Sequence, residues 1–193
     1  MNHVMIDIET LGTNTNAPIA SIGAVFFEPS TGMTGARFYV RVDAENDELN
    51  GAVASVATFK WWLKQSREAQ AELLARDAIP LWDALCQLDG FLTDNAVHEG
   101  LGLLQVWGNS PAFDCAILRA AYARADFEGP LWKFRNERDC RTMVELGKVI
   151  GFDPKQDMTF RGERHNALAD AIHQAQYVSH IWQHLTADKE PML

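Results

Sequence analysis

The sequence has little positive charge. Its 17 Lys and Arg residues stand against 26 Asp and Glu residues, which gives a formal net charge of −9 over 193 residues. An acidic excess of this size disfavours long-range, non-specific attachment to duplex DNA. The sequence also lacks a Walker A loop, a dinucleotide-binding fingerprint and a Gly-x-Ser-x-Gly motif, which argues against the enzyme classes that depend on them.

Cysteine is scarce as well, with three residues and no Cys-x-x-Cys pair. An odd number of unpaired positions predicts reduced thiols and therefore a cytoplasmic location. No apolar stretch reaches the roughly 20 residues of a membrane span, and no basic segment followed by an apolar run marks a signal peptide at the start. We therefore expect a soluble intracellular protein that does not bind membranes.

The chain has ample material for a core, since 47% of its residues are hydrophobic. Apolar patterns predict an antiparallel meander of strands at about 4–10, 17–28 and 35–42, with further strands at 103–108 and 136–139. Helical patterns fall at about 56–65, 67–75, 80–93, 111–124, 141–149 and from 166 onward. The acidic stretch 43–50 and the end, 186–193, are expected to be flexible. The pattern is that of a mixed α/β protein.

Asp7 and Glu9 stand two residues apart in the first predicted strand. Side chains at this spacing project from the same face of a strand, roughly 6.6 Å apart along it. Two such carboxylates repel each other and raise each other's pKa unless a cation keeps them ionised. The pair indicates either a metal site or an acidic surface at the exposed end of an edge strand.

Asp114 follows the apolar segment 103–108, which we expect to be a buried strand. Asn109, Ser110 and Pro111 then supply a loop, a helix N-cap and a proline suited to a first helical turn. The helix dipole favours an acid near this point. The end of a strand before a helix is also where α/β sheets place binding sites, so Asp114 is a candidate for either role.

His165 and Asp170 stand at the start of the last predicted helix. Seven apolar residues recur there at helical spacing: Leu168, Ala171, Ile172, Ala175, Val178, Trp182 and Leu185. The preceding segment 158–164 contains glycine and no clear periodicity, so we expect His165 to lie on a mobile loop. A histidine at a helix start is, by itself, also typical of a capping or solvated group.

Together these segments resemble the three motifs of the DEDD family of 3'→5' exonucleases. Asp7 and Glu9 match the first motif, Asp114 the second, and His165 with Asp170 the third. Asn166, not tyrosine, stands four residues before Asp170, which indicates the histidine-bearing DEDDh branch.

The resemblance covers about residues 3–185. Segment 55–65, with Trp61 and Trp62, is most similar to the small single-domain members, which include a phage exonuclease A and short exoribonucleases. It implies one 3'-5' exonuclease domain over 1–193, with a ribonuclease H-like fold: a mixed five-stranded sheet with helices on both faces.

The family chemistry explains the residue types. Hydrolysis of a phosphodiester needs a deprotonated water and a stabilised leaving oxygen, which two metal ions can provide together. Hard oxygen ligands favour Mg²⁺ or Mn²⁺. We assign Asp7 to bridge both ions, Glu9 and Asp170 to the ion that activates water, and Asp114 to the second ion, largely through bound waters. His165 would take the proton from the nucleophilic water as general base.

Six residues are predicted to contact the nucleic acid. Aromatic rings can stack on bases of any sequence, arginines beside the proposed base can bind phosphate, and the resemblance implies that the residues after Glu9 approach the terminal nucleotide. The candidates are Leu11, Gly12, Trp61, Phe113, Arg161 and Arg164.

The expected activity is release of nucleoside 5'-monophosphates from the 3' end of single-stranded nucleic acid or from 3' overhangs, with RNA slightly favoured over DNA. Two alternatives stay open: a non-catalytic nucleic-acid-binding module, and a phosphodiesterase acting on short oligonucleotides. Relatives such as RNase T and oligoribonuclease act as homodimers, which implies a possible homodimer here.

Overall fold

The computed structural model describes residues 1–97 and 101–187, and its centre is one mixed five-stranded sheet in the order β3-β2-β1-β4-β5. β1 pairs antiparallel with β2 and parallel with β4, which places it in the middle. All five predicted strands are present. Their bounds are His3–Thr10 for β1, Ile19–Glu28 for β2, Met33–Arg41 for β3, Gln105–Gly108 for β4 and Glu137–Asp139 for β5.

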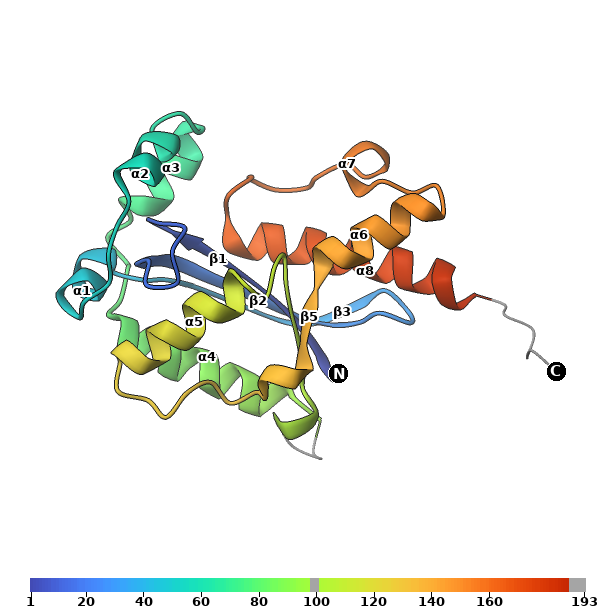
Figure 1. Ribbon diagram of the computed structural model, residues 1–193, viewed down its shortest axis with the longest axis horizontal. Helices are drawn as coiled ribbons and strands as arrows, with labels where there is room; N and C mark the ends of the chain where they lie inside the picture. The colour runs from blue at the N-terminus through green and yellow to red at the C-terminus, as the bar shows by residue number, and fades with distance from the viewer. Residues whose placement is uncertain (98–100, 188–193) are drawn as a thin grey trace.

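Helices cover both faces of the sheet (Figure 1), as expected. α4 (Leu81–Asn95) and α5 (Asp114–Arg124) pack on the face that carries Val4, Ile6 and Ile8 of β1. α6 (Cys140–Val149) and α8 (Ala167–Thr186) pack on the opposite face, against Met5. Because side chains alternate along a strand, Asp7 and Glu9 share the face of Met5 and project towards α8.

Gly23 allows α8 to approach the sheet closely beside Asp7. It is the direct β2 partner of Asp7, and a Cβ atom built on it would lie 2.2 Å from the main-chain atoms of Ala167 and Leu168. No side chain fits at that distance, so the first turn of α8 rests on bare backbone. This close approach brings the residues at the start of α8 next to the end of β1.

The acidic stretch 43–50, expected to be a flexible loop, contains helix α1 (Ala44–Leu49). Asp43 caps this helix by accepting hydrogen bonds from the main-chain N–H groups of Glu45 and Asn46. Asp47 is completely buried and forms an ion pair with Arg124 of α5 at 2.9 Å. The sequence did not indicate this helix, because the ion-pair partner of Asp47 lies 77 residues away along the chain. In the terminal stretch 186–193, Thr186 ends α8, and residues 188–193 lie outside the described part of the chain.

Two further helices, α2 (Val56–Trp62) and α3 (Arg67–Leu73), stand beyond the end of β1. Helix α5 begins at Asp114, three residues later than predicted, because the Ser110 carbonyl accepts hydrogen bonds from both the Phe113 and the Asp114 N–H in a tight turn. The short helices η1 (Leu101–Leu103), η2 (Phe134–Asn136) and α7 (Pro154–Asp157) had no clear sequence signal. Within the described residues, no helix has the length and apolar character needed to cross a bilayer.

Candidate active site

One cavity of about 280 Å³ collects the acids and the histidine singled out in the sequence. It lies where β1 and β4 end and where α5 and α8 begin, so four separate elements contribute to it. We call it the carboxylate cavity. The predicted residues that line it are Asp7, Glu9, Phe113, Asp114, His165 and Asp170.

Glu9, His165 and Asp170 form the tightest group in this cavity. One potential ligand atom from each of the three lies within 4.8 Å of the others, and no other set of three acids, histidines or cysteines in the described residues is arranged in this way. Asp7 and Asp114 lie deeper, with exposures of 8% and 2%. The cavity therefore combines a close group of three partly exposed side chains with two buried carboxylates.

The pKa values of all four carboxyl groups in the cavity are raised. Loss of hydration raises the pKa of Asp7, and repulsion from Asp114, Glu9 and Asp170 raises it further. Burial likewise raises the pKa of Glu9 to about 8 and that of Asp114 to about 6. Burial also raises the pKa of Asp170, against the effect of a hydrogen bond from the His165 main chain. A cation among these oxygens would relieve the repulsion, and carboxylate oxygens are the ligands that Mg²⁺ and Mn²⁺ prefer.

The main chain holds His165 close to the carboxylates. Its φ of 65° lies in the left-handed region that residues other than glycine rarely occupy. Its N–H donates a 2.8 Å hydrogen bond to Asp170 Oδ2, and its ring packs edge-on against Trp61 with 4.8 Å between centroids. The loop before α8 thus has a defined position at His165 in this structure.

The adjacent tryptophans have different environments. Trp62 is buried, at 2% exposure, and its Nε1–H donates to the Thr10 carbonyl at 2.9 Å. Trp61 is 43% exposed and faces the His165 ring. Trp62 therefore supports the end of β1, and Trp61 is the one available to a ligand.

Sequence reasoning missed Gln174. It lies four residues after Asp170 on α8, on the same face of the helix, and its Nε2 donates a 2.7 Å hydrogen bond to Asp7 Oδ1 within the protein interior. Its Oε1 is buried and has no hydrogen-bond partner among the described residues. The i, i+4 spacing from Asp170 was the available signal, but glutamine on a helix is too common to single out.

Gly108 at the end of β4 was also missed. A Cβ atom built there would lie 2.8 Å from Asp114 Oδ2, so a side chain would displace that carboxylate. Its position at the end of a predicted strand was the only hint in the sequence. Arg141, near the start of α6, lines the carboxylate cavity too, and its charge lowers the pKa of Asp114.

The predicted nucleic-acid contacts fall in different places. Gly12, Trp61 and Phe113 line a neighbouring cavity of about 410 Å³, here called the aromatic cavity, which shares Ile8, Glu9 and Phe113 with the carboxylate cavity. A Cβ atom on Gly12 would lie 2.9 Å from Ala17 Cβ, so packing alone also calls for glycine there.

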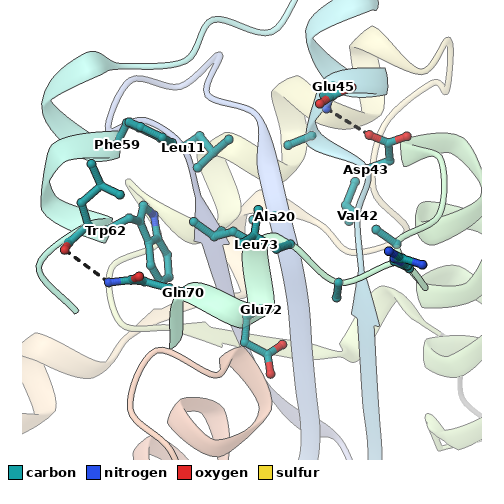
Figure 2. A pocket seen from close by; sticks show the side chains of 16 residues that line it. Leu11, Ala20, Val42, Asp43, Glu45, Phe59, Trp62, Gln70, Glu72 and Leu73 are labelled. Carbon is teal, nitrogen blue, oxygen red and sulfur yellow. Dashed lines mark hydrogen bonds between the residues drawn. The ribbon is translucent and has the colours of Figure 1, made fainter. Parts of the chain in front are cut away.

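Leu11 does not join this group. It lines a separate cavity of about 660 Å³ beneath α2 and α3, together with Phe59 and Trp62 (Figure 2). Arg164 stacks on the Phe160 ring, with 4.9 Å between its Cζ and the ring centroid, and lines a fourth cavity, which Asp170 also lines. Arg161 is exposed and lines none of these cavities.

A family model described as the 3'-5' exoribonuclease Rv2179c-like domain matches residues 2–182. No curated protein matches the chain at a significant level by sequence.

Several solved nuclease structures share the fold. Exonuclease I, in a structure described as suggesting how processivity is achieved, superposes with a TM-score of 0.66 at 14% identity over 95% of this chain and 42% of that chain. The E. coli exonuclease I complex with a dT13 oligonucleotide gives 0.61 at 12% identity over 93% of this chain. In that complex this chain spans 40% of the exonuclease I chain.

The nuclease domain of 3'hExo, described as a DEDDh family member bound to rAMP, gives a TM-score of 0.61 at 13% identity over 94% of this chain and 92% of that domain. At these identities the likeness shows the fold, which is the ribonuclease H-like α/β fold of DEDDh exonucleases. The expected fold class is therefore confirmed.

Proposed function

The chain belongs to the family of Rv2179c-like 3'-5' exoribonuclease domains, and on that premise we propose that it is a metal-dependent 3'-5' exonuclease that releases nucleoside 5'-monophosphates from single-stranded ends or 3' overhangs. The observation that carries the proposal is the convergence of Glu9, His165 and Asp170 within 4.8 Å, above the buried Asp7 and Asp114. RNA is the slightly preferred strand, which the exoribonuclease description of the family supports.

The donor set fits two divalent ions, Mg²⁺ or Mn²⁺. All four carboxylates have raised pKa values, so their charges lack sufficient positive compensation in the protein alone. Asp7 would contact both ions, Glu9 and Asp170 the ion next to the attacking water, and Asp114 the other. When bound, the ions would supply Lewis acidity for the attacking water and for the leaving oxygen.

His165 is proposed as the general base because it is the one basic side chain within the tight group. Its ring would accept the proton of the attacking water at an imidazole nitrogen. The hydrogen bond from its N–H to Asp170 fixes it relative to a metal ligand, and Trp61 packs on the ring. These two interactions hold the His165 ring in place before substrate binds, so less conformational entropy is lost when the ring is positioned for reaction.

The aromatic cavity is proposed to bind the 3'-terminal nucleoside. The exposed Trp61 and the half-buried Phe113 offer rings on which a base can stack irrespective of sequence. The cavity adjoins the carboxylates through Glu9, so a nucleoside held there has its 5' phosphate next to the proposed metals. Gly12 leaves the wall of this cavity without a side chain at that point.

The test uses 5'-labelled single-stranded RNA and DNA of matched sequence with Mg²⁺ or Mn²⁺. The expected result is a ladder that shortens from the 3' end, that disappears with EDTA or in Asp7→Ala, and that slows by orders of magnitude in His165→Ala. Asp94→Ala, which removes an exposed acid on α4, is the matched control and should cleave like the parent. Absence of cleavage with metal present would favour a non-catalytic binding module.

Three further properties are part of the proposal. Residues 3–185 act as one exonuclease domain. The protein works in the cytoplasm, which its free Cys86, Cys115 and Cys140 support.

The third property is a homodimer, for which the exposed Val56, Phe59 and Leu63 around α2 offer an apolar surface. Light scattering of the parent and of Phe59→Glu tests the dimer, because a monomeric mass for the parent would exclude it.

A further inference from the structure

A second cavity beside the carboxylates is lined by four basic side chains. It lies between α6, α7 and α8, has a volume of about 620 Å³, and is here called the basic cavity. We propose that it binds the substrate phosphate immediately 5' to the scissile phosphate. The inference rests on the proposed exonuclease function and adds the direction in which the strand runs. Its basic residues are Arg141, Lys148, Lys155 and Arg164.

The concentration of charge is unusual for this chain. Four of its 17 basic residues line this one cavity although the formal net charge is −9. Arg141, Lys155 and Arg164 form no ion pair with any residue in the described ranges, and only Lys148 is paired, with Glu145 at 2.7 Å. Cations without partners in a concave site attract anions more strongly than the same charges on a convex surface.

The basic cavity is continuous with the carboxylate cavity. The two share Asn109, Arg141, Asp170 and Gln174 in their walls. The aromatic cavity instead joins the carboxylate cavity through Ile8, Glu9 and Phe113. The acids therefore stand between an aromatic compartment on one side and a basic compartment on the other.

The chemistry of the two compartments sets the polarity of the strand. The described residues that line the aromatic cavity include no Lys or Arg, which suits a 3'-terminal nucleoside because no phosphate follows it. Upstream of the scissile bond every nucleotide brings one phosphate, and these charges need cations to replace the lost water and counterions. The strand thus reaches the acids past α6 and α7 and ends against Trp61.

Arg164 shows how this cavity is prepared for a phosphate. Its guanidinium lies over the Phe160 ring, with 4.9 Å from Cζ to the centroid. A stacked guanidinium keeps its N–H edge free for two parallel hydrogen bonds to phosphate oxygens.

The experiment uses 5'-fluorescein tetranucleotides of the preferred sugar type that differ at one linkage. In one, the second phosphodiester from the 3' end is replaced by an uncharged methylphosphonate. With the parent protein we expect this replacement to raise KM for release of the 3' nucleotide about fivefold, the size expected for a partly exposed ion pair. Cleavage of the all-phosphodiester tetranucleotide by the parent tests the exonuclease function separately.

A double-variant comparison locates the effect. In Lys155→Ala/Arg164→Ala, which removes two of the unpaired cations of the basic cavity, the KM for the all-phosphodiester substrate should rise to about the value that the parent shows for the methylphosphonate. The methylphosphonate replacement should then raise KM little further. The slope of log KM against log salt should become shallower by about 0.7, because the protein then neutralises one phosphate fewer. Glu145→Gln, which frees Lys148, should instead lower KM.

Lys133→Ala/Arg135→Ala is the matched control, because it removes two charges that line none of these cavities. It should keep the full response to the methylphosphonate. The assignment is wrong if the parent cleaves both tetranucleotides with equal KM. It is equally wrong if the two double variants weaken both substrates alike, since that result would reflect general attraction and not a phosphate site.

Discussion

Replacing Gln174 by leucine should weaken metal binding without weakening the fold. The Gln174 amide donates a 2.7 Å hydrogen bond to Asp7, the carboxylate proposed to contact both metals. Leucine has a similar size and no donor, so the change removes the hydrogen bond and leaves no large cavity. Gln174 therefore tests whether a residue behind a metal ligand positions that ligand.

The structure supplies the expected size of the effect. A hydrogen bond to a charged group contributes about 1.5–3 kcal/mol, and loss of a residue that orients a metal ligand typically weakens metal affinity about 10- to 100-fold. The bond also lowers the pKa of Asp7 against the stronger effect of burial. Without it the proton competes better with the metal, so the loss of affinity should shrink as pH rises.

Calorimetric titration of Mn²⁺ into the parent and Gln174→Leu at several pH values measures this directly. Gln176→Leu, on an exposed position of the same helix, is the control and should bind Mn²⁺ like the parent. In EDTA, Gln174→Leu should unfold within a few degrees of the parent. Loss of the hydrogen bond to Asp7 destabilises the fold, but removal of the buried Oε1, which has no partner among the described residues, offsets this loss.

Equal Mn²⁺ affinity in the parent and in Gln174→Leu would refute the positioning role. A drop in affinity accompanied by a large fall in the metal-free melting temperature would refute it too, because the residue would then act through packing.

Three other outcomes follow from the structure. The pKa values of Glu9 and Asp114 are raised to about 8 and about 6, so folding is favoured while these groups stay protonated. The metal-free melting temperature should therefore fall as pH rises from about 5 to 8, and saturating Mg²⁺ should flatten this slope; a rise with pH in EDTA would contradict the assignment. Gly23→Ala should displace the start of α8 from the sheet, because its Cβ would lie 2.2 Å from the Ala167 main chain. Asp170 would move with the helix, so the affinity for Mn²⁺ should fall. An Mn²⁺ affinity equal to that of the parent would contradict this displacement. Arg124→Leu leaves Asp47 buried without its ion pair. Denaturant titration should show a free energy of unfolding about 3–5 kcal/mol lower than that of the parent. The control Arg135→Leu, on the surface, should change the free energy of unfolding by no more than about 0.5 kcal/mol.

The strands and long helices could be predicted because their signals are local. Alternating or continuous apolar residues mark β1, β2 and β4, and an apolar stripe at helical spacing marks α8. Helix α1 could not be predicted, because a run of acidic residues looks like a solvated loop until Arg124 is brought to Asp47. Local pattern fails where a distant partner compensates a buried charge.

The candidate site divides in the same way. The five acidic and histidine positions were evident as motifs at strand and helix ends, and the structure places all of them in one cavity. The sequence could not show which of the adjacent Trp61 and Trp62 is exposed. Only the approach of α2 to Thr10 buries Trp62 and leaves Trp61 exposed. Leu11 and Arg161, expected near the substrate, lie outside the carboxylate and aromatic cavities.

The sequence by itself determined which chemical groups this protein can bring to a site: four carboxylates, one histidine and the elements that carry them. Only the tertiary structure decided how far apart they lie, which of them are dehydrated and what stands behind them. Gly23 and Gly108 have no chemistry of their own, yet the space they leave allows α8 and Asp114 to approach. Residues of this kind are invisible in a linear pattern, because hydration, repulsion and steric exclusion depend on distances between segments that the chain order does not specify.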